Sequence, residues 1–143
     1  MSIPIRLLIP RRLYEVMIAQ AVQELPNECC GLLAGRIVPE LPDRTVTERF
    51  PLVNADASPR EYTSDAKSLI QAHRAMRERR VDILAVYHSH PSSDPIPSRK
   101  DLERNAHGSA VVHLIISLKN AAPLVRAWRL GENDFQEADW RIV

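Results

Sequence analysis

The chain has 143 residues, of which 45% are hydrophobic and 26% charged, and its formal net charge at pH 7 is +1. This length predicts a single domain over residues 1–143, large enough to bury its own core. The near-neutral charge argues against a nucleic-acid-binding protein, which would carry a basic excess. No stretch is long and apolar enough to span a bilayer, and the N-terminus lacks the pattern of a secretion signal, so we expect a cytoplasmic protein without a membrane partner.

The first part of the chain is predicted to form a strand, a helix and a second strand. Residues 3–9 are mostly branched and apolar, which favours a strand, and Pro10 suits the opening turn of a helix that runs to about Leu25. Residues 26–27 should end this helix, and residues 29–38 should form the next strand. The helix is expected to turn one apolar stripe towards the core: Leu13, Val16, Met17, Ala21 and Leu25.

The second of these strands contains both cysteines of the chain, Cys29 and Cys30. Neighbouring strand residues point to opposite faces, so the two thiols make a poor disulfide pair and cannot easily share one metal ion. We expect two small buried hydrophobic residues and a reducing compartment. Gly31 and Gly35 in the same strand permit bending or the close approach of another backbone.

The middle of the chain is predicted to continue the sheet and to add a second helix. Residues 39–43 have the composition of a turn, residues 45–53 that of a strand with partial alternation, and residues 54–60 that of a polar loop. Ser64 or Asp65 is expected to cap the helix that follows. One face of this helix carries Leu69, Ala72, His73 and Met76. We expect His73 to lie at the edge of the core, because a lone histidine on an apolar face usually finds a hydrogen-bond partner rather than a metal.

Two histidines follow a buried strand predicted over residues 83–87. Because strand side chains alternate between faces, His88 and His90 should point the same way, with Ser89 opposite. Pro91 cannot donate a backbone hydrogen bond and should end the strand. The sequence therefore predicts two imidazoles together at the mouth of the strand, where α/β folds place their ligand clefts.

A third metal ligand is expected from the loop that follows, with Asp94 and Asp101 as candidates. We favour Asp101, because Pro95 and Pro97 stiffen a loop that could bring a new element back beside the histidines. Two neutral imidazoles and one carboxylate suit one zinc ion and leave the fourth position open, as in catalytic zinc sites. A plainer interpretation is that Ser98 and Asp101 form a helix-capping signature beside satisfied polar histidines. Both can hold, since a helix starting at Ser98 would keep Asp101 in its first turn.

The C-terminal part of the chain is predicted to be β-structure. Residues 110–118 form a strongly apolar strand in which we expect His113 to be a satisfied core residue. Residues 124–130 and 135–143 are expected to be two strands joined by a turn over residues 131–134. Together these elements predict an α/β domain with a mixed central β-sheet flanked by helices.

The segment from His88 to Asp101 resembles the signature of the JAMM (MPN+) zinc metalloproteases: His-Ser-His-Pro, six residues, then Ser-x-x-Asp. The resemblance implies that His88, His90 and Asp101 hold zinc and that Ser98 faces the oxyanion. Residues 28–35 are similar to the family's Glu-x-Cys-Gly-Leu-Leu-x-Gly segment, which implies that Glu28 is the general acid/base. Taken alone, Glu28 would be interpreted as a surface charge at a loop edge. Family domains share a central sheet flanked by helices, similar in layout to the cytidine deaminases, with zinc at the sheet's edge.

The resemblance to compact stand-alone members of this family implies a zinc metallopeptidase that works without a covalent intermediate. Eukaryotic members carry insertions that grip ubiquitin, for which the loop between Pro91 and Ser98 has no room. Some compact members act on ubiquitin-like sulfur-carrier proteins, and we expect hydrolysis of a peptide or isopeptide bond after a C-terminal Gly-Gly of such a carrier. The alternatives are a non-catalytic scaffold or peptide-binding module and a broad-specificity zinc peptidase. A zinc deaminase is disfavoured, because the sequence lacks both His-x-Glu and Pro-Cys-x-x-Cys.

Overall fold

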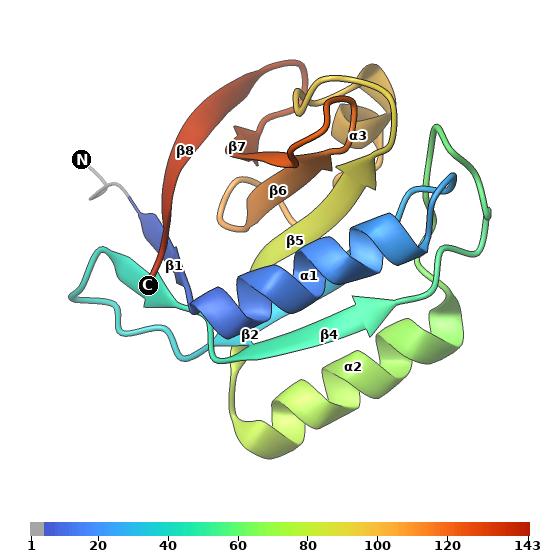
Figure 1. Ribbon diagram of the computed structural model, residues 1–143. Helices are drawn as coiled ribbons and strands as arrows, with labels where there is room; N and C mark the ends of the chain where they lie inside the picture. The colour runs from blue at the N-terminus through green and yellow to red at the C-terminus, as the bar shows by residue number, and fades with distance from the viewer. Residues whose placement is uncertain (1–4) are drawn as a thin grey trace.

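The computed structural model describes residues 5–143 and has an eight-stranded mixed β-sheet with helices on both faces (Figure 1). The elements in chain order are β1 (Arg6–Ile9), α1 (Arg11–Gln23), β2 (Cys30–Gly35), β3 (Asp43–Thr45), β4 (Glu48–Leu52), α2 (Ala66–Arg79), β5 (Asp82–His90), α3 (Arg99–Glu103), β6 (Val112–Ser117), β7 (Leu124–Leu130) and β8 (Phe135–Ile142). The strand order is β3-β1-β8-β7-β6-β5-β2-β4, in which β5 and β6 are parallel neighbours and β2 is antiparallel to β5. The predicted fold class is confirmed.

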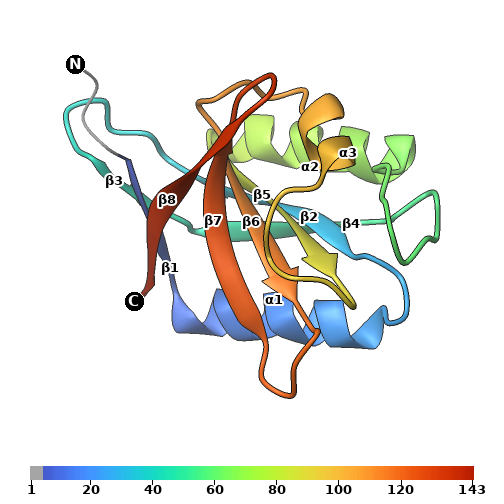
Figure 2. The same ribbon diagram turned by 90° about the horizontal axis from the view of Figure 1, so that it is seen from above.

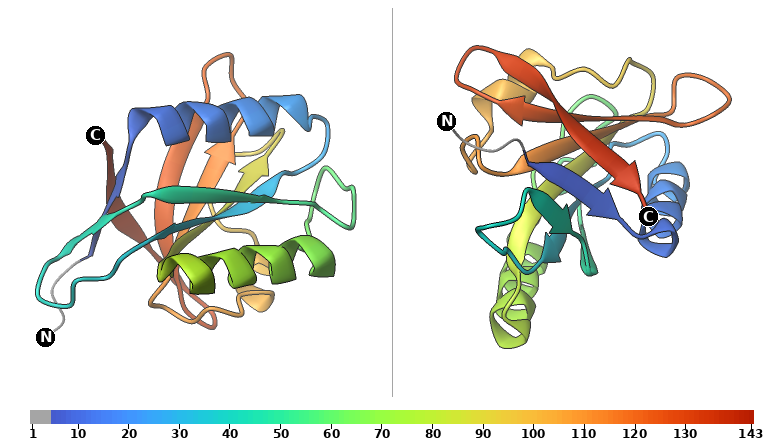
Figure 3. Two further views of the ribbon diagram at one scale, coloured as in Figure 1. Left: turned by 90° about the horizontal axis from the view of Figure 1, so that it is seen from below. Right: turned by 90° about the vertical axis from the view of Figure 1, so that its left-hand side faces the viewer.

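The sheet curls until its two outer strands nearly meet (Figure 3). β3 and β4 lie at opposite ends of the strand order, yet two residues join them: the Val46 amide donates to the Leu8 carbonyl at 2.8 Å and the Thr47 amide to the Ala34 carbonyl at 2.9 Å. A Cβ atom at Gly35 would lie 2.3 Å from the Thr45 carbonyl oxygen, which confirms the close backbone approach predicted there. The prediction of a single strand over residues 45–53 is therefore wrong, because the chain changes its pairing partner from β1 to β2 at the link formed by Val46 and Thr47.

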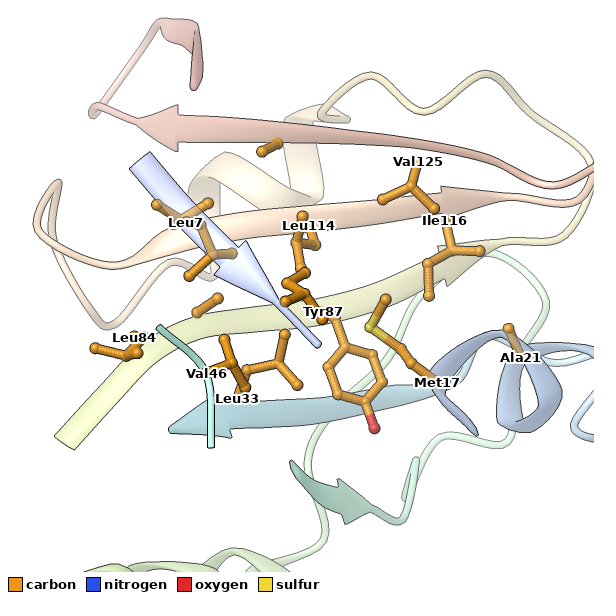
Figure 4. Packing of buried hydrophobic residues seen from close by; sticks show 14 of the residues in the cluster. Leu7, Met17, Ala21, Leu33, Val46, Leu84, Tyr87, Leu114, Ile116 and Val125 are labelled. Atoms are coloured by element: carbon orange, nitrogen blue, oxygen red, sulfur yellow. The ribbon is translucent and has the colours of Figure 1, made fainter. Parts of the chain in front are cut away.

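The helices cover opposite faces of the strands, with α1 on one side and α2 and α3 on the other (Figure 2). The larger core lies on the α1 side, where Met17 of α1 packs with Leu33, Tyr87 and Leu114 from three strands (Figure 4). The second core lies between the sheet and α2: Cys30, Leu32, Ala34, Leu52, Ala72, Met76 and Val86. Both cysteines are buried free thiols, as predicted.

The buried face of α1 differs from the predicted stripe. Met17 and Ala21 are buried, with Leu13, Tyr14 and Ile18 packed beside them. Val16 is 47% exposed and Leu25 is 44% exposed. Leu25 lies beyond the last helical residue, so the helical period no longer sets its direction.

Most other boundaries lie close to the predicted ones. The predicted strand over residues 3–9 is observed as β1, although residues 3–4 lie outside the described residues. β2 is shorter than the strand predicted over residues 29–38. Asp43 was predicted to lie in a turn, but it belongs to β3 and pairs with Arg6 of β1. Asp65 caps α2 by accepting from the Ser68 amide at 3.1 Å. Among the helices of residues 5–143, none combines the length and the apolar character needed to cross a membrane.

Candidate metal and catalytic site

The helix α3 brings Asp101 back to the end of β5. Ser98 is its N-cap: the Ser98 hydroxyl accepts from the Asp101 amide at 3.1 Å, and the Asp101 carboxylate accepts from the Ser98 amide at 2.8 Å. This reciprocal capping box satisfies two backbone donors at once. Leu102 packs on a cluster formed by β6 and β7, which holds the short helix against the sheet. The helix-capping interpretation is confirmed, and the cap directs the Asp101 carboxylate towards the histidines.

His88, His90 and Asp101 bring their ligand atoms together. The two Nε2 atoms of the histidines are 3.1 Å apart, and the Asp101 carboxylate oxygens lie 3.2 Å from His88 Nε2 and 3.3 Å from His90 Nε2. Zinc bonds of about 2.0–2.1 Å in a tetrahedral site separate neighbouring ligand atoms by about 3.3 Å. Both histidines are buried. The three residues therefore fit a zinc ion in distance and in chemistry, and they could hold one.

Hydrogen bonds prepare these side chains for a cation. Nδ1 of His90 lies 2.8 Å from the Asp94 carbonyl oxygen, to which it donates, so the lone pair of the neutral ring is on Nε2. Burial by itself would raise the pKa of Asp101, but the charge and hydrogen bond of His88, the hydrogen bond of His90 and the Ser98 amide hold that pKa well below its usual range. Asp101 is therefore a carboxylate at neutral pH. Asp94, the alternative ligand, contributes its carbonyl oxygen here, while its side chain pairs with Lys119.

Two side chains from neighbouring strands fasten the loop between β5 and α3. The Ser117 hydroxyl donates to the Ser93 carbonyl at 2.6 Å, and Nε1 of Trp128 donates to the Pro95 carbonyl at 2.8 Å. These bonds hold the backbone that supplies the Asp94 carbonyl and begins α3. Neither Ser117 nor Trp128 was singled out from sequence, because no local spacing links them to a loop more than twenty residues earlier.

Glu28 lies beside this group, although it is distant in sequence. Cys30 pairs with His88 in the antiparallel β2–β5 ladder, so Glu28, two residues earlier, lies across from His90. Its side chain is buried at 4% exposure, which contradicts its interpretation from residue type alone as a surface charge. Burial raises the pKa of Glu28 to about 8, opposed by His90 and reinforced by Asp101. Among the described residues, Oε1 of Glu28 is buried with no hydrogen-bond partner.

His113 and His73 do not belong to the ligand group. His113 is buried and its Nε2 lies 3.2 Å from Oδ1 of Asn105; burial lowers its pKa to about 4, so it is neutral. This confirms the prediction of a satisfied core residue. His73 is exposed. It lines a pocket of about 690 Å³ between α2 and α3, which Asp101 and Val86 also line.

The chain resembles known proteins along most of its length. Residues 10–131 match the family described as prokaryotic homologs of the JAB domain. A CysO-cysteine peptidase from Mycobacterium tuberculosis is 28% identical over 137 residues, which cover 96% of this chain and 91% of that protein. A probable TtuB-protein conjugate cleaving protease from Thermus thermophilus is 37% identical over 98 residues, or 68% of this chain and 62% of that protein.

A solved structure shows the same fold. The solution structure of a protein from Desulfitobacterium hafniense superposes with a TM-score of 0.85 at 32% sequence identity, covering 96% of this chain and 92% of that one. The resemblance carried by the His-x-His and Ser-x-x-Asp motifs is thereby confirmed. The chain belongs to the prokaryotic JAB family, the stand-alone prokaryotic branch of the JAMM proteins.

Proposed function

We propose that this protein is a zinc metallopeptidase that hydrolyses a peptide or isopeptide bond after the C-terminal Gly-Gly of a ubiquitin-like sulfur-carrier protein. The observation that carries the proposal is that a group of candidate metal ligands and a buried carboxyl group lie side by side. Three buried or half-buried ligands stand at the separations of a tetrahedral zinc site, and a buried carboxyl group, Glu28, lies beside them without a partner at Oε1 in the described part of the chain. A non-catalytic scaffold has no evident use for both.

In this proposal each residue has one task. His88, His90 and Asp101 would hold the zinc ion, which when bound supplies a Lewis acid and lowers the pKa of water towards about 7. Glu28 would accept a proton from the attacking water and return it to the leaving amine. A carboxyl group beside the metal can serve in both directions, because it accepts a proton as a carboxylate and donates it again as an acid.

Ser98 would donate a hydrogen bond to the oxyanion that forms on the substrate carbonyl. Its capping bond uses the hydroxyl oxygen as acceptor, which leaves the hydroxyl proton available. The hydroxyl is also held in place by that bond, because the cap fixes the first turn of α3. A prepositioned donor of this kind stabilises the transition state more than the ground state.

The substrate class rests on two supports. The relatives' names pair a peptidase with CysO-cysteine and a protease with TtuB-protein conjugates. In addition, the loop between β5 and α3 is short and is fastened to the neighbouring strands, so it carries no insertion that could grip a large folded substrate. A flexible Gly-Gly tail needs no such grip, because it can pair with a strand through its main chain and its glycines add little steric bulk.

The test is mass spectrometry of purified ubiquitin-like carriers extended after Gly-Gly by cysteine, another single residue or a longer peptide, and of a lysine-linked conjugate. We expect the wild-type protein to remove the extension, and the zinc-stripped and Glu28→Gln proteins to leave it. A carrier ending in Ala-Ala before the same extension is the matched control and should stay intact. Trimming of general peptides with Gly-Gly carriers left whole would instead identify a broad peptidase. Stable carrier binding without hydrolysis would identify a scaffold.

A further inference from the structure

Asn54 is a buried amide whose hydrogen-bonding capacity is fully used. Its Nδ2 donates to the Glu28 carbonyl at 3.0 Å and to the Glu61 carbonyl at 3.1 Å. Its Oδ1 accepts from the Asp56 amide at 3.1 Å and from the Thr63 amide at 3.2 Å. The side chain is thus the centre of the loop over residues 54–64, and one of its four bonds leaves that loop to reach Glu28.

The same loop occupies both backbone polar groups of Glu28. The Glu28 amide donates to the Ser58 carbonyl at 2.8 Å, and the Glu28 carbonyl accepts from Asn54. In the described residues, Oε1 of the Glu28 side chain has no hydrogen-bond partner. The place of the carboxyl group is therefore set by its backbone and by packing, so a shift of the loop would move it directly.

The loop also reaches the elements that carry the metal ligands. Arg104 of the segment after α3 donates to the Tyr62 carbonyl at 3.1 Å and to the Thr63 hydroxyl at 3.3 Å. Lys100 of α3 forms an ion pair with Glu61. The ring of Tyr62 lies 4.9 Å from that of His88, centroid to centroid. One short loop therefore contacts Glu28 on one side and the support of the ligand group on the other.

We propose that Asn54 is a positioning residue for Glu28: through the 54–64 loop it sets the distance between the Glu28 carboxyl group and the His88–His90–Asp101 group. This inference rests on the proposed function for the role of Glu28, but the physical link from Asn54 to Glu28 does not. Loss of the Nδ2 donor would leave zinc bound and substrate affinity nearly unchanged while the proton carrier is misplaced. A misplacement of about 1 Å costs about 10²-fold in turnover.

The experiment compares Asn54→Asp with Asn105→Asp. The first change keeps an acceptor for the Asp56 and Thr63 amides but sets a carboxylate oxygen against the Glu28 and Glu61 carbonyls. Asn105 organises another loop in the same manner, through the Gly108 carbonyl at 3.3 Å and the His107 amide at 3.0 Å, and has no bond to Glu28. Asn54→Ala, which adds no charge, serves if the carboxylate prevents folding. Each variant is measured for zinc content, for kcat and KM on a Gly-Gly carrier, and for amide hydrogen exchange at residues 27–31.

We expect both Asn54 variants to keep zinc, to exchange faster at Glu28, and to lose about 10²-fold in kcat with KM within about twofold. In a Glu28→Gln background the Asn54 change should have no further effect on residual turnover, because the two residues act through one group. Asn105→Asp should resemble the wild type in exchange at residues 27–31. Full kcat in the Asn54 variants, or losses that add to Glu28→Gln, would overturn the positioning role. If the wild type cleaves no carrier, the proposed function fails. If amide exchange at Glu28 is unchanged in the Asn54 variants, the physical link from Asn54 to Glu28 is refuted.

Discussion

The ring of Tyr87 lies directly over Gly31, its partner in the β2–β5 ladder. A Cβ atom at Gly31 would lie 2.1 Å from Cζ of Tyr87. The ring cannot swing away easily, because its hydroxyl donates to Gln20 Oε1 at 2.5 Å and accepts from Arg49 Nη1 at 3.1 Å. The glycine that follows the two cysteines thus leaves room for an aromatic ring one residue before His88.

Gly31→Ala should therefore destabilise the protein by about 1–3 kcal/mol, the usual cost of overpacking a core. Urea unfolding followed by circular dichroism measures the change. Tyr87→Leu, which removes the ring, should lose stability by itself but should make the added alanine nearly harmless in the double variant. If Gly31→Ala lowered stability equally in the wild-type and Tyr87→Leu backgrounds, its contact with the Tyr87 ring would not be the cause.

The ligand group should bind one zinc ion for each chain. His88→Ala/His90→Ala should lose the metal, because a single carboxylate is left where three ligands stand at zinc-binding separations. Metal analysis of the purified proteins measures the loss. Asp94→Ala is the matched control: it removes only the side chain that pairs with Lys119 and keeps the carbonyl that orients His90, so zinc should stay. Full zinc content in the double variant would assign the metal to other residues.

Ser98→Ala should reduce turnover by about 10²–10³-fold, the usual effect of losing one oxyanion donor. Stability should fall by about 1 kcal/mol as well, because the hydroxyl also caps α3. Ser98→Thr keeps the hydroxyl and should restore the stability. Kinetics and thermal unfolding of the two variants separate the effects: a Ser98→Ala protein that loses stability but not turnover would confine Ser98 to capping.

Zinc-free protein should lose stability as the pH rises through the titration of Glu28. Burial raises the pKa of this group from 4.5 to about 8. Between these two values the folded state binds more protons than the unfolded state, so its stability falls with increasing pH. Glu28→Gln cannot ionise and should be indistinguishable from wild type near pH 4 but melt on the order of 5 °C higher near pH 9.

Thermal unfolding across this range, with the metal removed by chelation, measures the effect. Exposed Glu132 offers a control, since Glu132→Gln should follow the wild-type curve at every pH. Parallel curves for wild type and Glu28→Gln would show that the Glu28 carboxyl group is solvated rather than buried.

Local patterns in the sequence were sufficient to predict most of the elements and the grouping of the three candidate ligands. His88 and His90 point the same way because strand side chains alternate, and Asp101 enters the first turn of α3 because Ser98 caps it. Both relations involve only residues two or three positions apart in the chain. The strand over residues 124–130 was predicted with its observed bounds for the same reason.

Pairings between distant segments could not be predicted in this way. Residues 45–53 have the composition of one strand, but their backbone groups bond to β1 on one side of the link and to β2 on the other. Val16 has the spacing of a core residue, but it is 47% exposed, because the core cluster packs against Leu13, Tyr14, Met17, Ile18 and Ala21 of α1 instead. In both places the partner decides the outcome, and the partner is remote in the chain.

The sequence by itself determined which side chains gather at the end of β5: two imidazoles, a carboxylate and a capped serine, at spacings that short-range geometry converts into one group. The tertiary structure decided what surrounds that group. It brought Glu28 across from His90 and buried it, and it placed Asn54 and Trp128 where they hold the neighbouring backbones. These contacts join residues about 25 to 60 positions apart, and they form only when the sheet closes around its core, which no local pattern records.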